Sequence, residues 1–181
     1  MDDSTVLKEV RSLIFTQREK VYWIAQTSGG WEGWLQCELA WRFRLSALRE
    51  AHVWKNRLKV DFHFGSSNYV VELKALGWNV IQGEKGTFRS KDSELNAFVN
   101  RVLADKDKIM RHRGAGISIA IVPAFNELYT NKILDDLKKR SYTISSINRD
   151  ISMAFWSQGE PRVQKRLLSG GESRPKKRAR A

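Results

Sequence analysis

Apolar positions along the chain repeat first with the period of a helix and then with the period of a strand. Residues 4–15 carry an apolar side chain at every third or fourth position and predict a first helix, capped by Ser4. After a glycine break, a second helix is expected over about residues 31–48. Residues 57–64 alternate strictly between apolar and polar, and a short polar turn leads into a return strand over Tyr69–Ala75. These two strands predict an antiparallel hairpin.

The second half of the chain predicts helices that alternate with strands. A third helix is expected over about 93–111, and a fourth from its cap Asn126 through about Lys139. The nearly continuous apolar run Gly116–Val122 is typical of a central strand covered on both faces. Shorter strands are expected at 78–81, 142–147 and 151–156. This order predicts an α/β fold with a mixed β-sheet flanked by helices.

Length and charge predict one domain followed by a basic tail. The 181 residues suffice for one domain of ordinary size, which we expect over residues 1–160. The apolar pattern then stops, and residues 161–181 are predicted to be disordered. The chain has a formal charge of +12. Eight Lys/Arg and one Glu place +7 of it in the tail. Such a charge favours a polyanionic partner, and we expect DNA, with RNA as the alternative.

Several other classes of protein are excluded. No apolar stretch approaches the roughly 18 residues of a membrane span, and the acidic start lacks the apolar segment of a secretory signal. The lone Cys37 can form neither an internal disulfide nor a zinc finger, and no P-loop motif occurs. We therefore expect an intracellular protein without a membrane partner. Nothing in the pattern indicates a homo-oligomer.

The tail contains a short basic cluster typical of a nuclear-import signal. Its residues are Arg174, Lys176, Lys177, Arg178 and Arg180. This interpretation predicts a nuclear location in a eukaryotic cell. A general phosphate-binding tail is the alternative.

Charged side chains share one face of the predicted hairpin. Because a strand alternates with a period of two, Asp61 lies with Glu72 and Lys74 on the face opposite the apolar positions. Two neighbouring carboxylates are costly unless a cation lies between them, and hard oxygen ligands suit Mg²⁺ or Mn²⁺. The alternative is a solvent-exposed strand face on which Lys74 pairs across to Asp61.

A third carboxylate interrupts an apolar stripe of the predicted second helix. The stripe consists of Trp34, Glu38, Trp41, Leu45 and Leu48. A buried carboxylate needs a partner, so Glu38 is a candidate for a further metal ligand, with Glu50 as its substitute. A helix-surface Glu38 that pairs with Arg42 is the alternative.

Asp61, ten intervening residues and then Glu72-Leu73-Lys74, after a helix with Glu38, resemble the PD-(D/E)XK nuclease superfamily. The resemblance covers about residues 28–122 and implies a restriction-endonuclease-like αβββαβ core. It departs from the family pattern just before Asp61, where Val60 stands in place of Pro.

The resemblance also implies roles for these residues. Asp61 and Glu72 would bind Mg²⁺ or Mn²⁺, Glu38 would assist, and the Leu73 backbone carbonyl would be an extra ligand. Lys74 would orient or activate the attacking water. The expected activity is that of a Mg²⁺-dependent deoxyribonuclease.

The alternative function is a catalytically inactive nuclease-like fold that binds nucleic acid or a protein partner. Six basic residues are candidates for nucleic-acid contacts in either case: Arg42, Arg57, His63, Lys108, Arg111 and Arg113.

Overall fold

The computed structural model describes residues 1–25, 31–44, 48–49, 52–53, 58–77, 92–112, 114–124 and 126–159. Its helices are α1 (Asp3–Thr16), α2 (Arg18–Ala25), α3 (Trp31–Arg42), α4 (Asp92–Arg111) and α5 (Glu127–Lys139). Its strands are β1 (Leu48–Arg49), β2 (His52–Val53), β3 (Leu58–Lys59), β4 (Phe62–Phe64), β5 (Tyr69–Ala75), β6 (Gly116–Pro123), β7 (Thr143–Asn148) and β8 (Ile151–Gln158). The predicted strand 78–81 and the predicted tail 161–181 lie outside the described residues.

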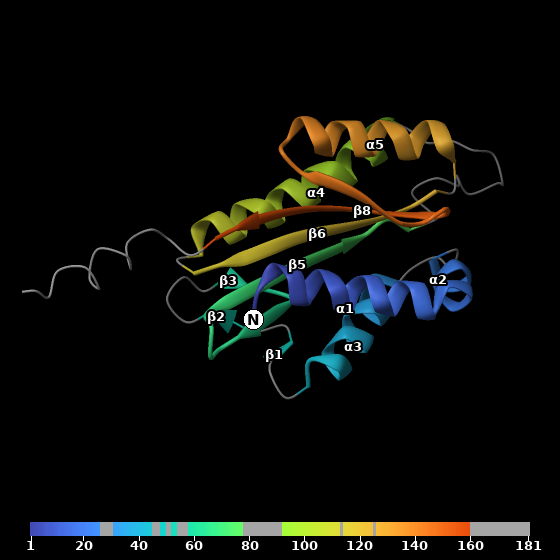
Figure 1. The fold of residues 1–181 in the computed structure, drawn as a ribbon. Coiled ribbons are helices and arrows are strands. Elements are labelled where there is room, and N and C mark those ends of the chain that lie inside the picture. Colours follow the sequence, from blue (N-terminus) through green and yellow to red (C-terminus); the bar gives the residue numbers. More distant parts are fainter. Residues whose placement is uncertain are drawn as a thin grey trace, which may run out of the picture.

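The strands form a six-stranded mixed sheet in the order β1-β4-β5-β6-β8-β7. The neighbours β5 and β6 are parallel, and α4 lies between them in the chain, as a parallel connection requires. The other four pairings of this sheet are antiparallel. Figure 1 shows α4 and α5 on one face of the sheet and α1, α2 and α3 on the other. The predicted α/β fold with a helix-flanked mixed sheet is therefore confirmed.

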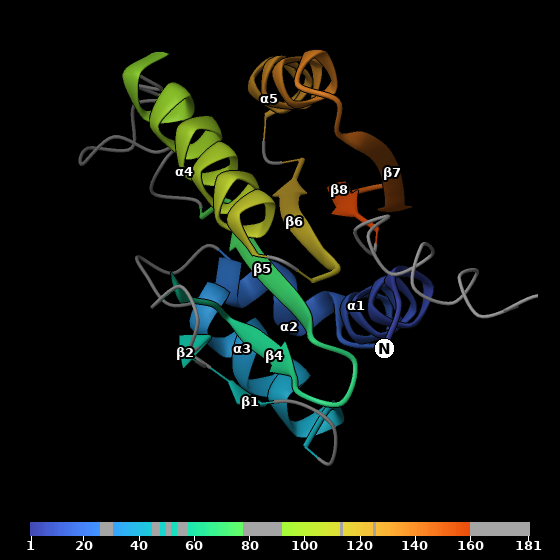
Figure 2. The same ribbon diagram turned by 90° about the vertical axis from the view of Figure 1, so that its left-hand side faces the viewer.

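Helices cover both faces of the sheet (Figure 2), and apolar side chains fill the space between the helices and each face. On one face α1, α2 and α3 pack against alternate residues of the strands, such as Phe62, Val71 and Ile119. On the other face α4 and α5 pack against the residues between them, such as Leu76 and Ala120. Every residue of β6 is buried, which confirms the predicted central strand. None of the described helices is long and apolar enough to cross a membrane.

Several predicted elements are confirmed with small shifts at their ends. The first helix begins one residue early because Asp2, rather than Ser4, is its N-cap and accepts a hydrogen bond from Thr5 N. Asn126 caps α5 as predicted. The sequence pattern did not reveal α2, and the second predicted helix ends at Arg42, since Leu48–Arg49 pair with β4 as β1.

The predicted strand over 57–64 is divided by a bend at Asp61. Before the bend, β3 pairs with β2 in a separate two-stranded sheet, and after it β4 pairs with β5. The bend breaks the period of two. Phe62 therefore joins the apolar packing with α1, α2 and α3, whereas Val60, which strict alternation places on the same face, packs with Val70 and Ile109 on the side of α4.

Candidate functional site

Two charged residues of β5 lie in an otherwise apolar row beneath α4. Alternate residues of β5 point to this face, and Val70 and the residue after the strand, Leu76, pack with residues of α4. Glu72 and Lys74 occupy the two positions between them. Glu72 is only 1% exposed. The alternative of a solvent-exposed strand face is therefore wrong, because α4 covers the face of β5 that carries Glu72 and Lys74, and α1, α2 and α3 cover the other face.

The helix α4 places a carboxylate directly over this row. Its buried stripe runs through Phe98, Val102, Asp105, Ile109 and His112, spaced by three or four residues. Asp105 is 3% exposed and interrupts the stripe with a charge. We did not single out Asp105 from the sequence. The signal that identifies it is the argument applied to Glu38: a charged residue at a position where the helical period requires an apolar one.

Ion pairs join the strand residues to α4. Lys108 Nζ lies 3.1 Å from Glu72 Oε2 and 2.9 Å from Asp105 Oδ1. Lys74 Nζ lies 3.3 Å from Asp105 Oδ2, without the alignment of a hydrogen bond, and 3.1 Å from Glu32 Oε1 in the first turn of α3. Asp105 thus pairs with both lysines.

Two carboxylates bind the outer edge of β5 where β4 no longer covers it. Leu73 N donates a hydrogen bond of 2.7 Å to Asp61 Oδ2, and Ala75 N donates one of 3.0 Å to Glu32 Oε2. The Leu73 carbonyl accepts a hydrogen bond of 3.2 Å from Lys74 Nζ. The bend at Asp61 therefore leaves an edge whose backbone groups are satisfied by side chains of the site.

These side chains form one group, which we name the carboxylate–lysine cluster. Its members are Glu32, Asp61, Glu72, Lys74, Asp105 and Lys108. Four carboxylates face two ammonium groups, so the cluster has a formal charge of −2 when all are ionised. Glu72 Oε1 is buried and has no hydrogen-bond partner among the described residues. An additional proton or cation would relieve this excess.

The excess of negative charge shifts the pKa values of the carboxylic acids upward. Burial, followed by the charges of Asp105 and Asp61, raises the pKa of Glu72 to about 8, against the opposing effect of Lys108. Burial also raises the pKa of Asp61, although the hydrogen bond from Leu73 N lowers it. A further cation at Glu72 would favour its ionised form and oppose this rise of the pKa.

The same carboxylates keep both lysines charged. Burial lowers the pKa of Lys74, but the carboxylates of Asp105, Glu32 and Asp61 outweigh it and raise the pKa above its ordinary value. Lys108 follows the same balance, with Asp105 and Glu72 outweighing burial. Each lysine is therefore a fixed positive charge rather than a proton acceptor at neutral pH.

Glu38 does not join the carboxylate–lysine cluster. It is partly exposed, and its Oε1 lies 3.3 Å from Lys20 Nζ of α2. The predicted stripe is wrong because α3 buries a different face, formed by Trp31, Leu35 and Leu39, while Trp41 is 66% exposed. The carboxylate of α3 that contacts Lys74 is Glu32, six residues before Glu38.

The predicted nucleic-acid contacts lie in several places. Arg42 pairs with Glu9 rather than Glu38, at 3.1 Å. His63 packs edge-on against the His112 ring, and Lys108 belongs to the cluster. Arg111 is exposed in the last turn of α4. Glu50, Arg57 and Arg113 lie outside the described residues.

The cluster supplies oxygen ligands of the kind that divalent cations prefer, but they are engaged by lysines and backbone N–H groups. In the described part of the chain, no three His, Cys, Asp or Glu side chains are arranged to hold a metal ion. Cation binding at Glu72 would therefore require a lysine to move. What the arrangement offers chemically is a buried negative site beside a permanently charged Lys74.

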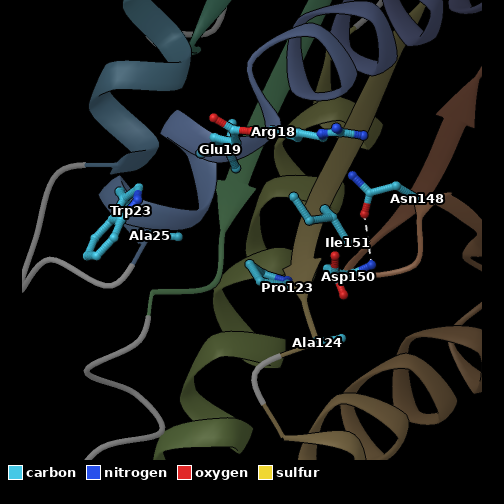
Figure 3. Close-up of a pocket in the computed structure, with 10 residues that line it drawn as sticks. Arg18, Glu19, Trp23, Ala25, Pro123, Ala124, Asn148, Asp150 and Ile151 are labelled. Carbon is cyan, nitrogen blue, oxygen red and sulfur yellow. Dashed lines mark hydrogen bonds between the residues drawn. The ribbon is translucent and has the colours of Figure 1, made fainter.

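A pocket of about 440 Å³ lies apart from the cluster, between α2, the end of β6 and the turn that joins β7 to β8. Figure 3 shows Arg18 extending toward Asn148, with Trp23 on the opposite side and Pro123 and Ile151 between them. No residue of the carboxylate–lysine cluster lines this pocket. It is therefore not part of the candidate site.

Comparison with known proteins identifies no relative: no family model, no curated protein and no solved structure matches this chain significantly.

Proposed function

We propose that the protein is a metal-dependent nuclease that hydrolyses phosphodiester bonds of DNA at the carboxylate–lysine cluster. The observation that carries this proposal is Glu72, a fully buried carboxylate whose Oε1 lacks a partner and whose surroundings already hold three more carboxylates. A cation between Glu72 and Asp61 would satisfy both. Such an excess of buried negative charge is typical of sites for hard divalent cations.

The arrangement of elements supports a restriction-endonuclease-like core. The chain runs from α3 through the hairpin β4–β5 and then α4 to the parallel strand β6. This is the order of helix, hairpin, helix and strand that the resemblance to PD-(D/E)XK nucleases implies. Asp61 precedes β4 and Glu72 lies within β5, so both candidate ligands come from the hairpin.

The donor set fits Mg²⁺ or Mn²⁺. Asp61 and Glu72 would hold the ion, with the Leu73 carbonyl beside them. Glu32 would take the role of the helical carboxylate that the resemblance assigns to Glu38. Hard cations of this size bind carboxylate and carbonyl oxygens. When bound, the ion would lower the pKa of a coordinated water and screen the charge of the scissile phosphate.

Lys74 would act as a fixed positive charge. Glu32, Asp105 and the Leu73 carbonyl hold its ammonium group from three sides, and its raised pKa keeps the group protonated. A positioned cation stabilises the negative charge that grows on phosphoryl oxygens as water attacks. The family resemblance implies products with a 5′-phosphate and a 3′-hydroxyl.

The charge of the chain supports a polyanionic substrate. The formal charge is +12 even though the cluster itself is acidic, so the excess of basic residues lies elsewhere. Lys and Arg that neutralise phosphates supply most of the sequence-independent affinity for DNA. RNA is the alternative substrate of the same chemistry.

A second candidate function is binding without catalysis, in the nucleus if the tail directs import. The observation that favours it is that Lys74 and Lys108 already neutralise part of the negative charge of the cluster. In this case the charged groups would only join α4 to β5.

Incubation of the purified protein with plasmid and single-stranded DNA, in Mg²⁺, Mn²⁺ or EDTA, tests the proposal. We expect cleavage with metal and none with EDTA. Glu32→Gln and Glu38→Gln form a matched pair, because both remove one carboxylate charge from α3. Loss of cleavage in Glu32→Gln alone supports the cluster as the site. Metal-independent DNA binding with no cleavage of any substrate would favour the second candidate, and loss in Glu38→Gln alone would contradict the assignment of Glu32.

A further inference from the structure

The ion pair between Lys108 and Glu72 joins one buried and one partly exposed partner. The carboxylate of Glu72 is 1% exposed on a central part of the sheet. The Lys108 side chain is 34% exposed, and its ammonium group ends a flexible stem of four methylene groups. Glu72 therefore cannot leave the site without unpacking β5 from α4, whereas Lys108 can reach solvent by rotation of its own side chain.

The second lysine of the cluster is held more firmly. The Lys74 side chain is 19% exposed, and its ammonium group contacts two carboxylates and the Leu73 carbonyl. Within the described part of the cluster, Lys108 contacts Glu72 and Asp105. Asp105 lies three residues before Lys108 on α4, so this contact is local to the helix and need not break when Lys108 leaves Glu72.

An ammonium group 3.1 Å from Glu72 Oε2 occupies the position that a cation would take at this oxygen. Two positive charges at one carboxylate repel each other strongly in a partly buried site. The unpartnered Glu72 Oε1 shows that the carboxylate can accept more positive charge than Lys108 provides. A divalent ion in place of Lys108 would supply Glu72 with twice the positive charge.

We propose that Lys108 is the internal counter-ion of Glu72 and that a divalent cation entering the carboxylate–lysine cluster displaces the Lys108 ammonium group toward solvent. This inference rests on the metal site of the proposed function. In metal-free protein Lys108 contacts Glu72, and metal binding competes with this contact. Lys108 thereby sets the affinity of the site for the cation.

Titration of metal-free protein with Mn²⁺, followed by the electron paramagnetic resonance signal of the unbound ion, tests the proposal. Lys108→Gln removes the competing charge, and its amide can still donate a hydrogen bond to Glu72. We expect Mn²⁺ to bind this variant about tenfold more tightly than wild type or more. Lys108→Arg keeps the charge and should show no gain. Lys139→Gln is the matched control, because it removes the same charge from the exposed surface of α5.

A second measurement uses wild-type protein and does not depend on how a variant folds. Amine-reactive labelling, read by mass spectrometry, should modify Lys108 faster in saturating Mn²⁺ than in EDTA, while Lys139 is labelled at the same rate in both. Displacement frees the ammonium group for reaction, which is the reason for the expected increase.

The outcomes separate this proposal from the nuclease activity. Equal Mn²⁺ affinity of Lys108→Gln and Lys139→Gln, or no Mn²⁺ binding to any form, would overturn the role of Lys108. Unchanged Lys108 labelling would do the same. If the affinity rises as expected but plasmid stays uncut, Lys108 is the counter-ion of a metal site that is not a nuclease site. If plasmid is cut with metal but the affinity does not rise, the nuclease proposal stands and this one falls.

Discussion

Replacing Glu72 by Gln should change how the stability of the protein depends on pH. Burial, with the charges of Asp105 and Asp61, raises the pKa of Glu72 from its ordinary 4.5 to about 8. Between these two pH values the folded protein keeps a proton on Glu72 that the unfolded chain has lost. A group whose pKa is raised in this way makes the free energy of unfolding fall as pH rises through the interval. Gln has nearly the same shape and no ionisation, so the variant lacks this loss.

The interval between the two pKa values gives the magnitude. Each pH unit corresponds to about 1.4 kcal/mol, so the full interval corresponds to on the order of 5 kcal/mol. This figure already includes the favourable ion pair with Lys108 at 3.1 Å, which lowers the pKa of Glu72. The Glu72→Gln variant should therefore gain stability relative to wild type by about 1.4 kcal/mol per pH unit between pH 5 and 8.

Urea denaturation in EDTA, followed by tryptophan fluorescence at several pH values from 4 to 9, measures this difference. Groups that do not interact with Glu72 cancel when the two curves are subtracted, whereas Asp61, Asp105 and Lys108 interact with it and contribute to the difference. Glu38→Gln is the matched control, since it removes a carboxylate from a surface ion pair, worth at most about 1 kcal/mol. A difference between Glu72→Gln and wild type that stays constant within about 0.5 kcal/mol over this range would refute the reasoning. It would mean that Glu72 is ionised in the folded protein at ordinary pH, with Lys108 as a sufficient partner.

Three further predictions concern the proposed activity and the tail. Asp61→Asn should abolish metal-dependent plasmid cleavage, although its amide oxygen can still accept the hydrogen bond from Leu73 N. Asp61→Ala loses this acceptor as well, so it should also lower the free energy of unfolding by about 1–3 kcal/mol. Activity that persists in Asp61→Asn would exclude Asp61 as a metal ligand. Lys74→Ala should lower the turnover rate by about two orders of magnitude or more with little change in DNA affinity; a large loss of affinity and no measurable wild-type cleavage would make Lys74 a phosphate contact. Deletion of residues 172–181 removes five Lys/Arg and one Glu, so the affinity for DNA should depend less steeply on salt concentration. A fluorescent fusion of the deleted protein should also lose nuclear accumulation. Unchanged accumulation would mean that the tail is only a phosphate-binding segment.

The sequence pattern predicts best where one period persists through an element. Tyr69–Ala75 forms β5 with the predicted bounds, and the apolar run Gly116–Val122 forms all but the last residue of β6. The period of two also places Glu72 and Lys74 on one face of the strand, as expected. These successes share a cause, because local alternation is sufficient to fix which residues of a strand share a face.

The choice between Glu38 and Glu32 could not be made from the period of the helix alone. Tryptophans occur on more than one face of α3, so a stripe can be drawn through Trp34 and Trp41 as well as through Trp31, Leu35 and Leu39. The structure buries Trp31, whose indole Nε1 donates a hydrogen bond of 3.0 Å to the Leu76 carbonyl beyond the end of β5. It leaves Trp41 exposed, with the Arg44 guanidinium 4.4 Å from its ring centroid. Tertiary contacts therefore decide which face points inward, and they bring Glu32 to Lys74.

The alternation of residues in the hairpin also cannot predict which side chains α4 contributes to the cluster. Which side chains of a distant helix meet a strand depends on the packing of the helix across the sheet. Asp105 and Lys108 are 31 and 34 positions after Lys74 in the chain, and only the crossover from β5 to β6 brings α4 over the strand. The charged residue Asp105 in the apolar stripe of α4 indicates a buried charge, but the sequence pattern does not predict which residues pair with it.

The position of the carboxylate–lysine cluster argues against a purely structural role. On both sides of Glu72 and Lys74 the contact between β5 and α4 is apolar, through Val70 with Ile109 at one end and Leu76 with Leu95 at the other. Replacement of buried ion pairs by apolar side chains of similar volume is often neutral or stabilising, because desolvation offsets the attraction of the charges. Apolar residues at these positions would therefore join α4 to the sheet at least as well. The buried oxygen of Glu72 that lacks a partner adds a cost that no ion pair of the cluster removes. The proposed divalent cation would satisfy this oxygen, which the packing of α4 on β5 does not do.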